Sequence, residues 1–360
     1  MTRKYRRALV VGKFAPFHKG HQRVIDEALR IADKVLVLVW SNPDFPDMPD
    51  EVRAGWIRTL YPRRVIVRTP SQPEVPRFFG QEDIREKPPM NDAPASYQLA
   101  FTRRMVMMAG WGRWSKDQVD VVVSAEPYGE DIAASLREVG AGNGGARSVK
   151  WQVDAVTLDR SELPISGTIL RADVHAMRKW MDSEVYAHFV ESAVFLGAES
   201  TGKSTLVEML ADQLQTAWVH EYGRAYYEEH GGVMDLDGYV EIAAHHQWLE
   251  ERAKRDPMVN KWVFVDTNAI TTQMFSYLYE RAALPELRQL ADGCVNRYKH
   301  WFVCDDDIPF EQDGWRDCEL ARSRVQGLII QDLDRRGIHY TVLKGPLDQR
   351  VRQVEAVLRG

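Results

Sequence analysis

The stretch GAESTGKST, residues 197–205, decides the fold of the second half of the chain, because it fits the phosphate-loop pattern G-x-x-x-x-G-K-[ST]. Its glycines let the backbone curl until N–H groups face phosphate oxygens. Lys203 would bring a cation to the β- and γ-phosphates, and Ser204 would offer a hydroxyl to Mg²⁺. The apolar run 192–196 predicts a buried strand before the loop, and 205–210 predicts the helix that follows it. The second half is therefore expected to bind a nucleoside triphosphate.

The composition favours two domains in a protein outside the membrane. At 360 residues the chain is long for one core. A net charge of −5 argues against nucleic acid as the main partner. The three cysteines, Cys294, Cys304 and Cys318, lie too far apart for a C-x-x-C motif, and we expect reduced, buried thiols. The N-terminal apolar run is too short for a signal peptide, and no segment approaches the roughly 18 apolar residues of a membrane span. We expect a cytoplasmic protein.

The first half begins as a βαβ unit. An apolar strand at 8–11 ends in Gly12, a helix is expected at 22–32, and 35–40 is a continuous apolar strand. Further strands are expected at 64–69, 120–124 and 151–158, and helices at 50–60 and 97–109. The tracts 70–94 and 141–145 are expected to be loops. We place the domain boundary within 183–191, which divides the chain into 1–186 and 187–360.

The loop GKFAPFHKGH, residues 12–21, resembles the G-x-F-x-P-x-H-x-G-H signature of the HxGH nucleotidyltransferase superfamily. It departs from that signature at Ala15, where the family often has Thr or Ser. His18 and His21 would donate hydrogen bonds to ATP phosphates at the start of the following helix. Such a site positions a substrate phosphate for attack on the α-phosphorus of ATP and stabilises the charge that develops. Surface or helix-capping histidines are the alternative interpretation.

A second motif, ISGTILR at 165–171, resembles the late ISGTxIR motif of the same family. Ser166 and Thr168 suit either helix capping or phosphate binding, and the forked Arg171 suits phosphate oxygens. The residues expected to bind ATP in this domain are Gly12, Lys13, Phe14, His18, His21, Ser166, Thr168 and Arg171. The residues expected near the acceptor, at strand ends and a helix start, are Trp40, Arg53, Glu126 and Tyr128.

The second half alternates strands and helices again, with strands expected at 262–266, 301–304 and 340–343. Asp266, at a strand end, would act as a Mg²⁺ ligand beside Ser204 or as a general base. The segment QDGWR, 312–316, resembles a kinase lid that closes arginines on the phosphates. The residues expected to bind ATP are Gly197, Glu199, Ser200, Thr201, Gly202, Lys203, Ser204, Thr205 and Arg316. The residues expected at the acceptor are Glu221, Tyr222, Arg224 and Asp266.

The order of these motifs, with HEYGR at 220–224 and VDTN at 265–268, resembles the NadR family over nearly the whole chain. Its members are bifunctional adenylyltransferases of nicotinamide mononucleotide (NMN) and kinases of nicotinamide riboside. The resemblance implies an α/β fold of two doubly wound parallel-sheet domains: a Rossmann-like HxGH nucleotidyltransferase domain, then a P-loop kinase domain. It also implies ATP and Mg²⁺ as cofactors. The catalytic residues would be His18, His21, Arg171, Lys203 and Asp266.

Some family members carry an N-terminal helix-turn-helix. Here the first strand begins by about Ala8, so we expect no DNA-binding function. A homo-oligomer is compatible with the sequence. Two alternatives stay open: a fused adenylyl- or cytidylyltransferase and nucleoside kinase for another acceptor, and a nucleotide-sensing regulator of slow turnover.

Overall fold

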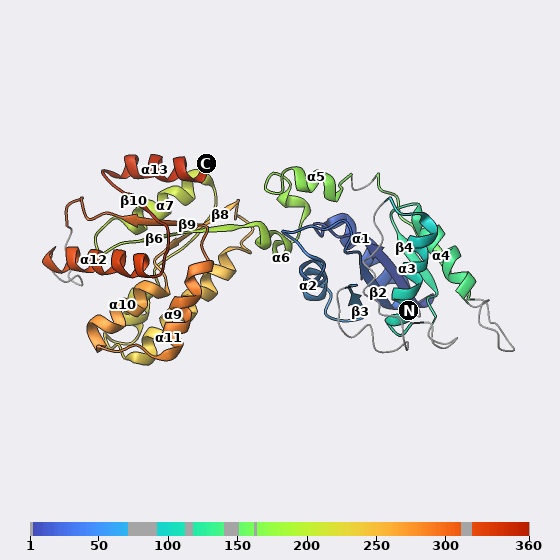
Figure 1. Cartoon of the computed structure of the whole chain (residues 1–360), viewed down its shortest axis with the longest axis horizontal. Coiled ribbons are helices and arrows are strands. Elements are labelled where there is room, and N and C mark those ends of the chain that lie inside the picture. The colour runs from blue at the N-terminus through green and yellow to red at the C-terminus, as the bar shows by residue number, and fades with distance from the viewer. Residues whose placement is uncertain are drawn as a thin grey trace. The chain divides into compact units, whose positions relative to one another are not determined.

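The computed structural model describes residues 3–70, 92–111, 118–139, 151–161, 164–310 and 319–359. The chain divides into two compact units, Met1–Val185 and Tyr186–Gly360 (Figure 1). Each unit is built around its own five-stranded sheet. Each is therefore described by itself.

The first unit contains a parallel sheet in the order β3-β2-β1-β4-β5. Its β1 pairs with β2 in a register that sets Ala8 beside Val35, and both strands are buried where their Val and Leu residues run together. Continuous apolar strands of this kind are typical of parallel sheets covered on both faces. The strands are β1 (Tyr5–Gly12), β2 (Ala32–Val39), β3 (Val65–Arg68), β4 (Val121–Ser124) and β5 (Asp154–Thr157).

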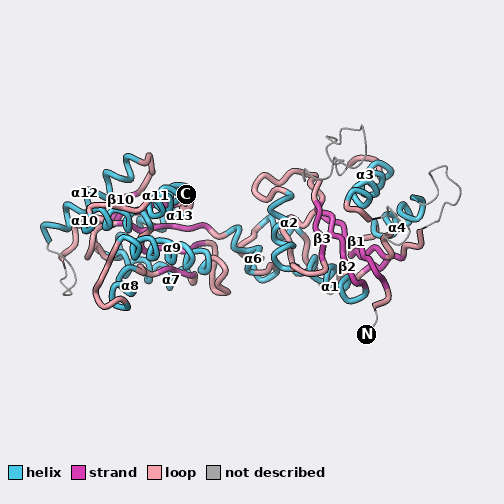
Figure 2. The backbone as a smooth tube through the Cα atoms, turned by 90° about the horizontal axis from the view of Figure 1, so that it is seen from below, coloured by secondary structure: helices cyan, strands magenta, loops and turns pink. Residues whose placement is uncertain are grey.

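Helices connect these strands. Helix α1 (Lys19–Ile31) buries Val24, Ile25 and Ala28, which share one helical face, and packs on β1 and β2. The other helices of the unit are α2 (Asp50–Leu60), α3 (Ala95–Met108), α4 (Tyr128–Val139), α5 (Gly167–Ala172), α6 (Ser183–Tyr186) and the 3₁₀ turn η2 (Arg178–Trp180). Figure 2 shows β1, β2 and β3 side by side in this unit.

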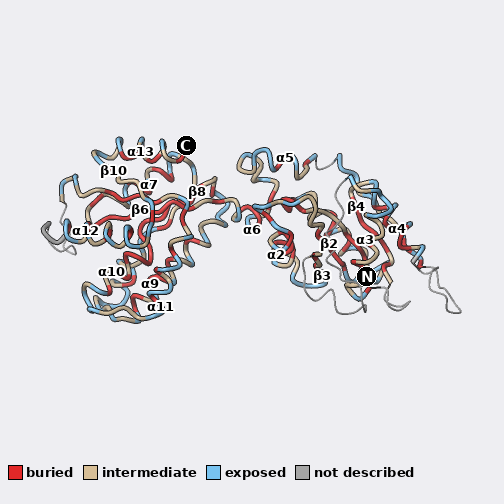
Figure 3. The backbone as a smooth tube through the Cα atoms, viewed as in Figure 1, coloured by how far each residue is buried: buried red, intermediate tan, exposed pale blue. Residues whose placement is uncertain are grey.

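The second unit contains a parallel sheet in the order β10-β9-β6-β8-β7. The central strand, β6, is buried from Ser192 to Leu196 and is followed directly by the phosphate loop. The strands are β6 (Glu191–Leu196), β7 (Ala217–Val219), β8 (Trp262–Asp266), β9 (His300–Cys304) and β10 (Thr341–Leu343). Figure 3 shows β6 and β8 as buried chain inside the unit, whereas the strands at the two edges of the sheet, β7 and β10, are only partly buried.

The helices of the second unit are α7 (Lys203–Leu214), α8 (Gly223–Glu229), α9 (Leu236–Ala253), α10 (Ala269–Glu280), α11 (Pro285–Gly293), α12 (Glu319–Arg335) and α13 (Leu347–Arg359). The unit also contains two 3₁₀ turns, η3 (Ala187–Phe189) and η4 (Cys294–Asn296). In both sheets the chain begins at the central strand, β1 in one unit and β6 in the other, and successive strands are then added on both sides of it. Ligands of doubly wound sheets bind at such switch points, beyond the carboxyl ends of the strands.

The predicted fold class, two doubly wound parallel-sheet α/β domains, is confirmed. Several element boundaries in the first unit differ from the prediction by one to three residues, including those of a helix and a strand. The helix expected at 22–32 begins earlier, at Lys19, and Ala32 instead opens β2. The strand expected at 151–158 is only Asp154–Thr157. Most of the tract 70–94, the tract 141–145 and the lid segment 312–316 lie outside the described residues.

Candidate active sites

The first unit contains a cavity of about 480 Å³ beyond the carboxyl ends of β1 and β4. Loops from distant parts of the chain meet here: the HxGH loop after β1, the turn after β4 and the ISGT segment. Of the residues predicted for this site, the cavity is lined by Gly12, Lys13, Phe14, His18, His21, Trp40, Glu126, Tyr128, Ser166, Thr168 and Arg171. The two motifs therefore form one site, as their pairing in the sequence indicates.

His18 and His21 lie at the start of α1, where His18 is the N-cap residue. Their rings stack with centroids 3.6 Å apart, and the His18 backbone N–H donates to Nδ1 of His21 at 3.4 Å. Burial, together with the charge of Arg160, lowers the pKa of His18 to about 4. Burial, with the charges of His18 and Arg160, holds the pKa of His21 well below its ordinary value. Both rings are thus neutral near pH 7 and can offer an N–H to a phosphate oxygen.

The ISGT segment contacts the HxGH loop directly. Ser166 caps α5 by accepting a hydrogen bond from the Ile169 N–H at 3.3 Å. Arg171 donates to the carbonyl of Ala15 and to Oγ1 of Thr168, the latter at 3.2 Å. Gly167 is needed for this approach, because a Cβ there would lie 2.5 Å from the Ala15 carbonyl oxygen. Arg171 is therefore both a cavity residue and a link between the two motifs.

Arg53 differs from its predicted place at the acceptor. Its side chain is 1% exposed and is absent from the described cavity wall. The guanidinium donates to the carbonyls of Met48 and Trp40, both at 2.8 Å, and to that of Lys13. Its position in the first turns of α2 suggested that Arg53 lies near the site. The side chain is instead buried and holds the backbone at Lys13 and Trp40. Arg53 therefore contacts backbone carbonyls and does not line the described cavity.

The other acceptor candidates lie on the cavity wall. The Trp40 ring meets Phe101 edge to face, and the Tyr128 hydroxyl donates to the Val11 carbonyl at 2.9 Å. Glu126 is paired with Arg160, a cavity residue that the sequence analysis missed. The available signal was a basic residue shortly before the ISGT motif, which points to no role by itself. Arg160 adds a cation beside the two histidines.

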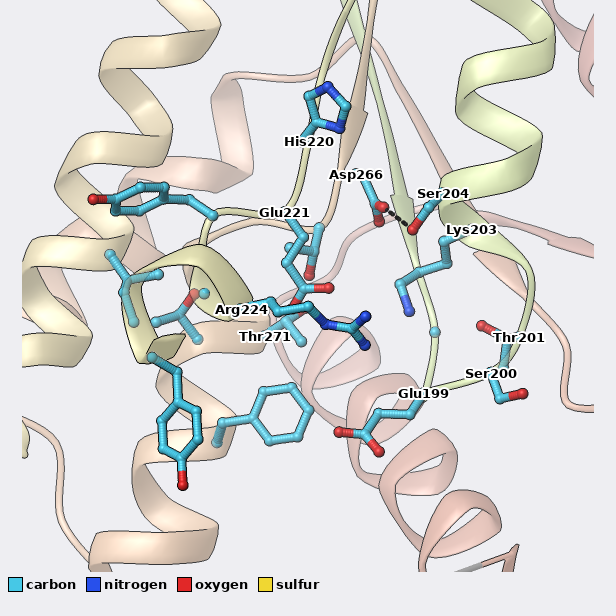
Figure 4. Close-up of a pocket in the computed structure, with 18 of the residues that line it drawn as sticks. Glu199, Ser200, Thr201, Lys203, Ser204, His220, Glu221, Arg224, Asp266 and Thr271 are labelled. Carbon is cyan, nitrogen blue, oxygen red and sulfur yellow. Dashed lines mark hydrogen bonds between the residues drawn. The ribbon is translucent and has the colours of Figure 1, made fainter. Parts of the chain in front are cut away.

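The second unit contains a larger cavity, of about 1070 Å³, around the phosphate loop (Figure 4). Of the residues predicted for this site, it is lined by Gly197, Glu199, Ser200, Thr201, Gly202, Lys203, Ser204, Thr205, Glu221, Tyr222, Arg224 and Asp266. Arg316 lies outside the described residues. The cavity thus brings together the phosphate loop, the HEYGR segment and the end of β8.

The phosphate loop has the left-handed backbone that its glycines permit. Gly202 has φ 75°, Ser200 has φ 57°, and a Cβ at Gly197 would lie 2.7 Å from the Cys304 carbonyl oxygen. The Lys203 ammonium donates to the Ala198 carbonyl at 2.9 Å. The lysine is therefore held over its own loop, where a bound phosphate would lie.

Two residues missed by the sequence analysis hold this loop in place. Arg350, from α13, is 2% exposed and donates to the Thr201 carbonyl at 2.6 Å. Gln326, from α12, accepts from the Ala198 N–H at 2.8 Å and donates to the Cys304 carbonyl at 2.9 Å. Neither residue belongs to a recognisable motif, so only the folded chain reveals them.

Ser204 and Asp266 face each other across the base of the cavity. The Ser204 hydroxyl donates to Oδ2 of Asp266 at 2.5 Å (Figure 4). Asp266 is 1% exposed, and within the described part of the chain its Oδ1 has no hydrogen-bond partner. Two hard oxygen donors and a buried, unsatisfied carboxylate oxygen fit Mg²⁺, which takes its remaining ligands from phosphates and water. Among the described residues, no cluster of three or more His, Cys, Asp or Glu side chains offers an all-protein metal site.

The HEYGR segment supplies the opposite wall. Figure 4 shows the Arg224 side chain reaching toward the phosphate loop and Glu221 facing the same cavity. Glu221 is exposed to the cavity, and desolvation by the neighbouring protein, together with the charge of Asp266, raises the pKa of its carboxyl. A carboxyl that holds its proton more tightly than usual suits a hydrogen bond with a substrate hydroxyl.

Comparisons with known proteins agree with this division. Residues 9–172 match the family model described as cytidylyltransferase-like, and residues 192–350 match the model described as an AAA domain. The trifunctional NAD biosynthesis/regulator protein NadR of Escherichia coli (strain K12) is 26% identical over 356 residues, covering 92% of this chain and 77% of that protein. The chain is thus similar to NadR over most of its length.

Two solved NadR structures share the fold of this chain. One is a crystal structure in complex with NR, and the other is in complex with NAD and AMP-PNP. Each superposes with a TM-score of 0.68 at 20% identity, covering 100% and 99% of this chain and 96% and 97% of the solved chains. As in NadR, the first unit is a nucleotidyltransferase-like domain and the second is a kinase-like P-loop domain. No helix in the described ranges is both long and apolar enough to cross a membrane.

Proposed function

We propose that this protein is a member of the NadR family and catalyses two consecutive steps of NAD synthesis, one in each cavity. The second unit would phosphorylate nicotinamide riboside with ATP to give NMN and ADP. The first unit would transfer AMP from a second ATP to NMN, giving NAD and pyrophosphate. The observation that supports this proposal is that the two units contain separate cavities, one lined by the HxGH and ISGT motifs and the other by the phosphate loop, in a chain similar to NadR.

In the kinase step, the riboside 5′-hydroxyl oxygen attacks the γ-phosphorus, and the bond to the β-phosphate oxygen breaks. Lys203 and the N-terminus of α7 stabilise the charge on the transferred group. Ser204 and Asp266 would hold Mg²⁺, which neutralises phosphate charge when it is bound. The hydroxyl proton passes to a cavity carboxylate, and Asp266 is the proposed base. Glu221, Tyr222 and Arg224 would hold the riboside.

In the adenylyl transfer step, a phosphate oxygen of NMN attacks the α-phosphorus of ATP, and pyrophosphate leaves. This chemistry needs no covalent enzyme intermediate, so the site acts by positioning and by charge stabilisation. The neutral His18 and His21 would donate N–H groups to the phosphates, and Lys13 and Arg171 would supply positive charge. Trp40, Glu126 and Tyr128 would contact NMN.

The proposal is tested by incubating the purified protein with Mg–ATP and NMN, and separately with Mg–ATP and nicotinamide riboside. Chromatography of the first mixture should show NAD and pyrophosphate, and the second should show ADP with NMN or NAD. Phosphopantetheine and other nucleosides serve as competing acceptors. Turnover of one of these in preference to NMN or the riboside would contradict the proposed acceptors while leaving the reaction types intact.

A further inference from the structure

We propose that His246 is a positioning residue of the kinase site, bracing the main chain at Asp266 so that its carboxylate faces Ser204 and the bound phosphates. His246 lies on α9, outside every motif discussed above, and lines the cavity of the second unit. The inference rests on the proposed phosphoryl transfer and names the residue that keeps its carboxylate in place.

The imidazole of His246 bridges two elements. Its Nε2 lies 3.2 Å from the main-chain carbonyl oxygen of Asp266, and its Nδ1 lies 3.2 Å from Oε1 of Glu250. The side chains of His246 and Glu250 are 3% and 1% exposed, so water does not compete for these contacts. The end of β8 is thereby tied to α9.

Glu250 is itself fixed by two further residues. The Tyr298 hydroxyl donates to its Oε1 at 2.7 Å, and the Arg297 guanidinium donates to its Oε2 at 3.1 Å. The result is a buried chain of polar contacts that runs from the segment after η4, through Glu250 and His246, to Asp266. A carboxylate with all of these partners cannot rotate away from His246 without losing several bonds at once.

The backbone conformation after Asp266 explains why the contact from His246 is needed. Thr267 is β-branched and 6% exposed, yet its φ is 67°, in the left-handed region that such residues rarely adopt. Backbone strain of this kind persists only where the surroundings over-determine it, and it concentrates at functional sites. The Thr267 N–H donates to the main-chain carbonyl of Phe195 at 3.0 Å, and the Asn268 side chain caps α10 by accepting from the Ile270 N–H. His246 adds a contact on the carbonyl just before the strained residue.

This strained turn sets the direction of the Asp266 side chain. Oδ2 accepts from Ser204, while the buried Oδ1 faces no hydrogen-bond partner among the described residues. Without the brace the turn can relax, and the carboxylate then leaves the position that a phosphate-bound Mg²⁺ requires. The phosphate loop itself should keep its shape, because Arg350 and Gln326 hold it from other helices.

The test compares His246→Ala and Glu250→Gln with a matched control, Glu251→Gln. Glu251 also pairs with Arg297 at 3.1 Å, but its side chain is 45% exposed. We expect both brace variants to lower kcat for riboside phosphorylation roughly 10- to 100-fold and to raise the half-saturating Mg²⁺ concentration. If a variant only contained less folded protein, its apparent kcat would fall, but its half-saturating Mg²⁺ concentration would stay unchanged. Adenylylation of NMN by the first unit reports on protein quality, and it should stay at the wild-type rate.

Calorimetry gives a readout that needs no turnover. AMP-PNP without metal should bind the brace variants as it binds the wild type, whereas Mg²⁺ should strengthen its binding to the wild type and to Glu251→Gln only. Wild-type kcat and Mg²⁺ dependence in both brace variants would overturn the inference, as would an equal loss in Glu251→Gln. If the wild type fails to phosphorylate the riboside, the proposed function fails, and the calorimetric comparison still decides the brace.

Discussion

The rings of His18 and His21 stack with their centroids 3.6 Å apart and their planes 23° from parallel, inside the cavity of the first unit. Two imidazolium rings could not share this space, because both charges would be buried against each other and beside Arg160. The geometry therefore favours two neutral rings that act as hydrogen-bond donors. The positive charge of the site comes instead from basic side chains that line the cavity, among them Lys13, Arg160 and Arg171.

This arrangement predicts that the first unit loses stability in mild acid. His18 titrates at about pH 4 in the folded protein and near 6.5 when unfolded. Above pH 6.5 His18 is neutral in both states. As the pH falls from 6.5 toward 4, the unfolded state takes up a proton that the folded state does not, and the free energy of unfolding decreases by up to about 3 kcal/mol. Hydrogen exchange of peptides from α1 should show less acid-induced loss of protection in His18→Gln than in the wild type. An equal loss in both proteins would exclude His18 as the cause.

Arg160→Gln should slow NAD formation from NMN, because the variant removes a cation from the phosphate side of the cavity. We expect a decrease of about tenfold or more in kcat/KM. The change should also raise the pKa of His18 and His21, although burial remains the larger cause of their low values. Arg30→Gln, whose side chain is 72% exposed and pairs with Glu27, is the control. Equal kcat/KM in Arg160→Gln and Arg30→Gln would show that Arg160 does not contribute to adenylyl transfer.

Gly167→Ala should damage the first unit, because the new Cβ would lie 2.5 Å from the Ala15 carbonyl oxygen and 3.0 Å from Arg171. We expect a loss of about 1–3 kcal/mol in stability together with slower adenylyl transfer. Gly55→Ala is the matched control on α2, where nothing lies within 4 Å of the added Cβ, and helix propensity favours the alanine. Chemical denaturation and NMN turnover would measure both effects. A harmless Gly167→Ala would show that the two motifs do not pack this closely.

Asp266→Asn should reduce riboside phosphorylation by roughly 100-fold or more, because the amide keeps the shape of the side chain and removes its charge. The exposed Asp292→Asn, which affects only the pair with Arg336, is the control. Initial rates at saturating Mg–ATP would measure the difference. A fully active Asp266→Asn protein would place the metal and the base elsewhere.

The phosphate loop, the HxGH loop and the ISGT segment could be located from the sequence because each motif encodes a local backbone shape. Gly197 and Gly202 adopt conformations that other residues rarely reach, and His18 begins α1 directly after its loop. The strands could also be predicted, since the continuous apolar runs 35–39 of β2 and 262–265 of β8 are buried in parallel sheets.

The residues that hold these motifs could not be predicted in the same way. Arg53 was expected at the acceptor, yet its guanidinium donates to three backbone carbonyls. Its direction depends on how α2 packs against the loop after β1. Arg350 and His246 act on the phosphate loop and on Asp266 across 149 and 20 residues of sequence. Their roles depend on tertiary contacts, which no local pattern encodes.

The most direct test of the two-site account follows labelled nicotinamide riboside in the presence of Mg–ATP. The wild type should convert it through NMN to NAD. His21→Ala should stop at NMN, because the kinase cavity is intact, and Lys203→Ala should leave the riboside unchanged while still making NAD from added NMN. The account would be contradicted if either variant, still folded, lost both reactions, or if the wild type made no NAD from NMN.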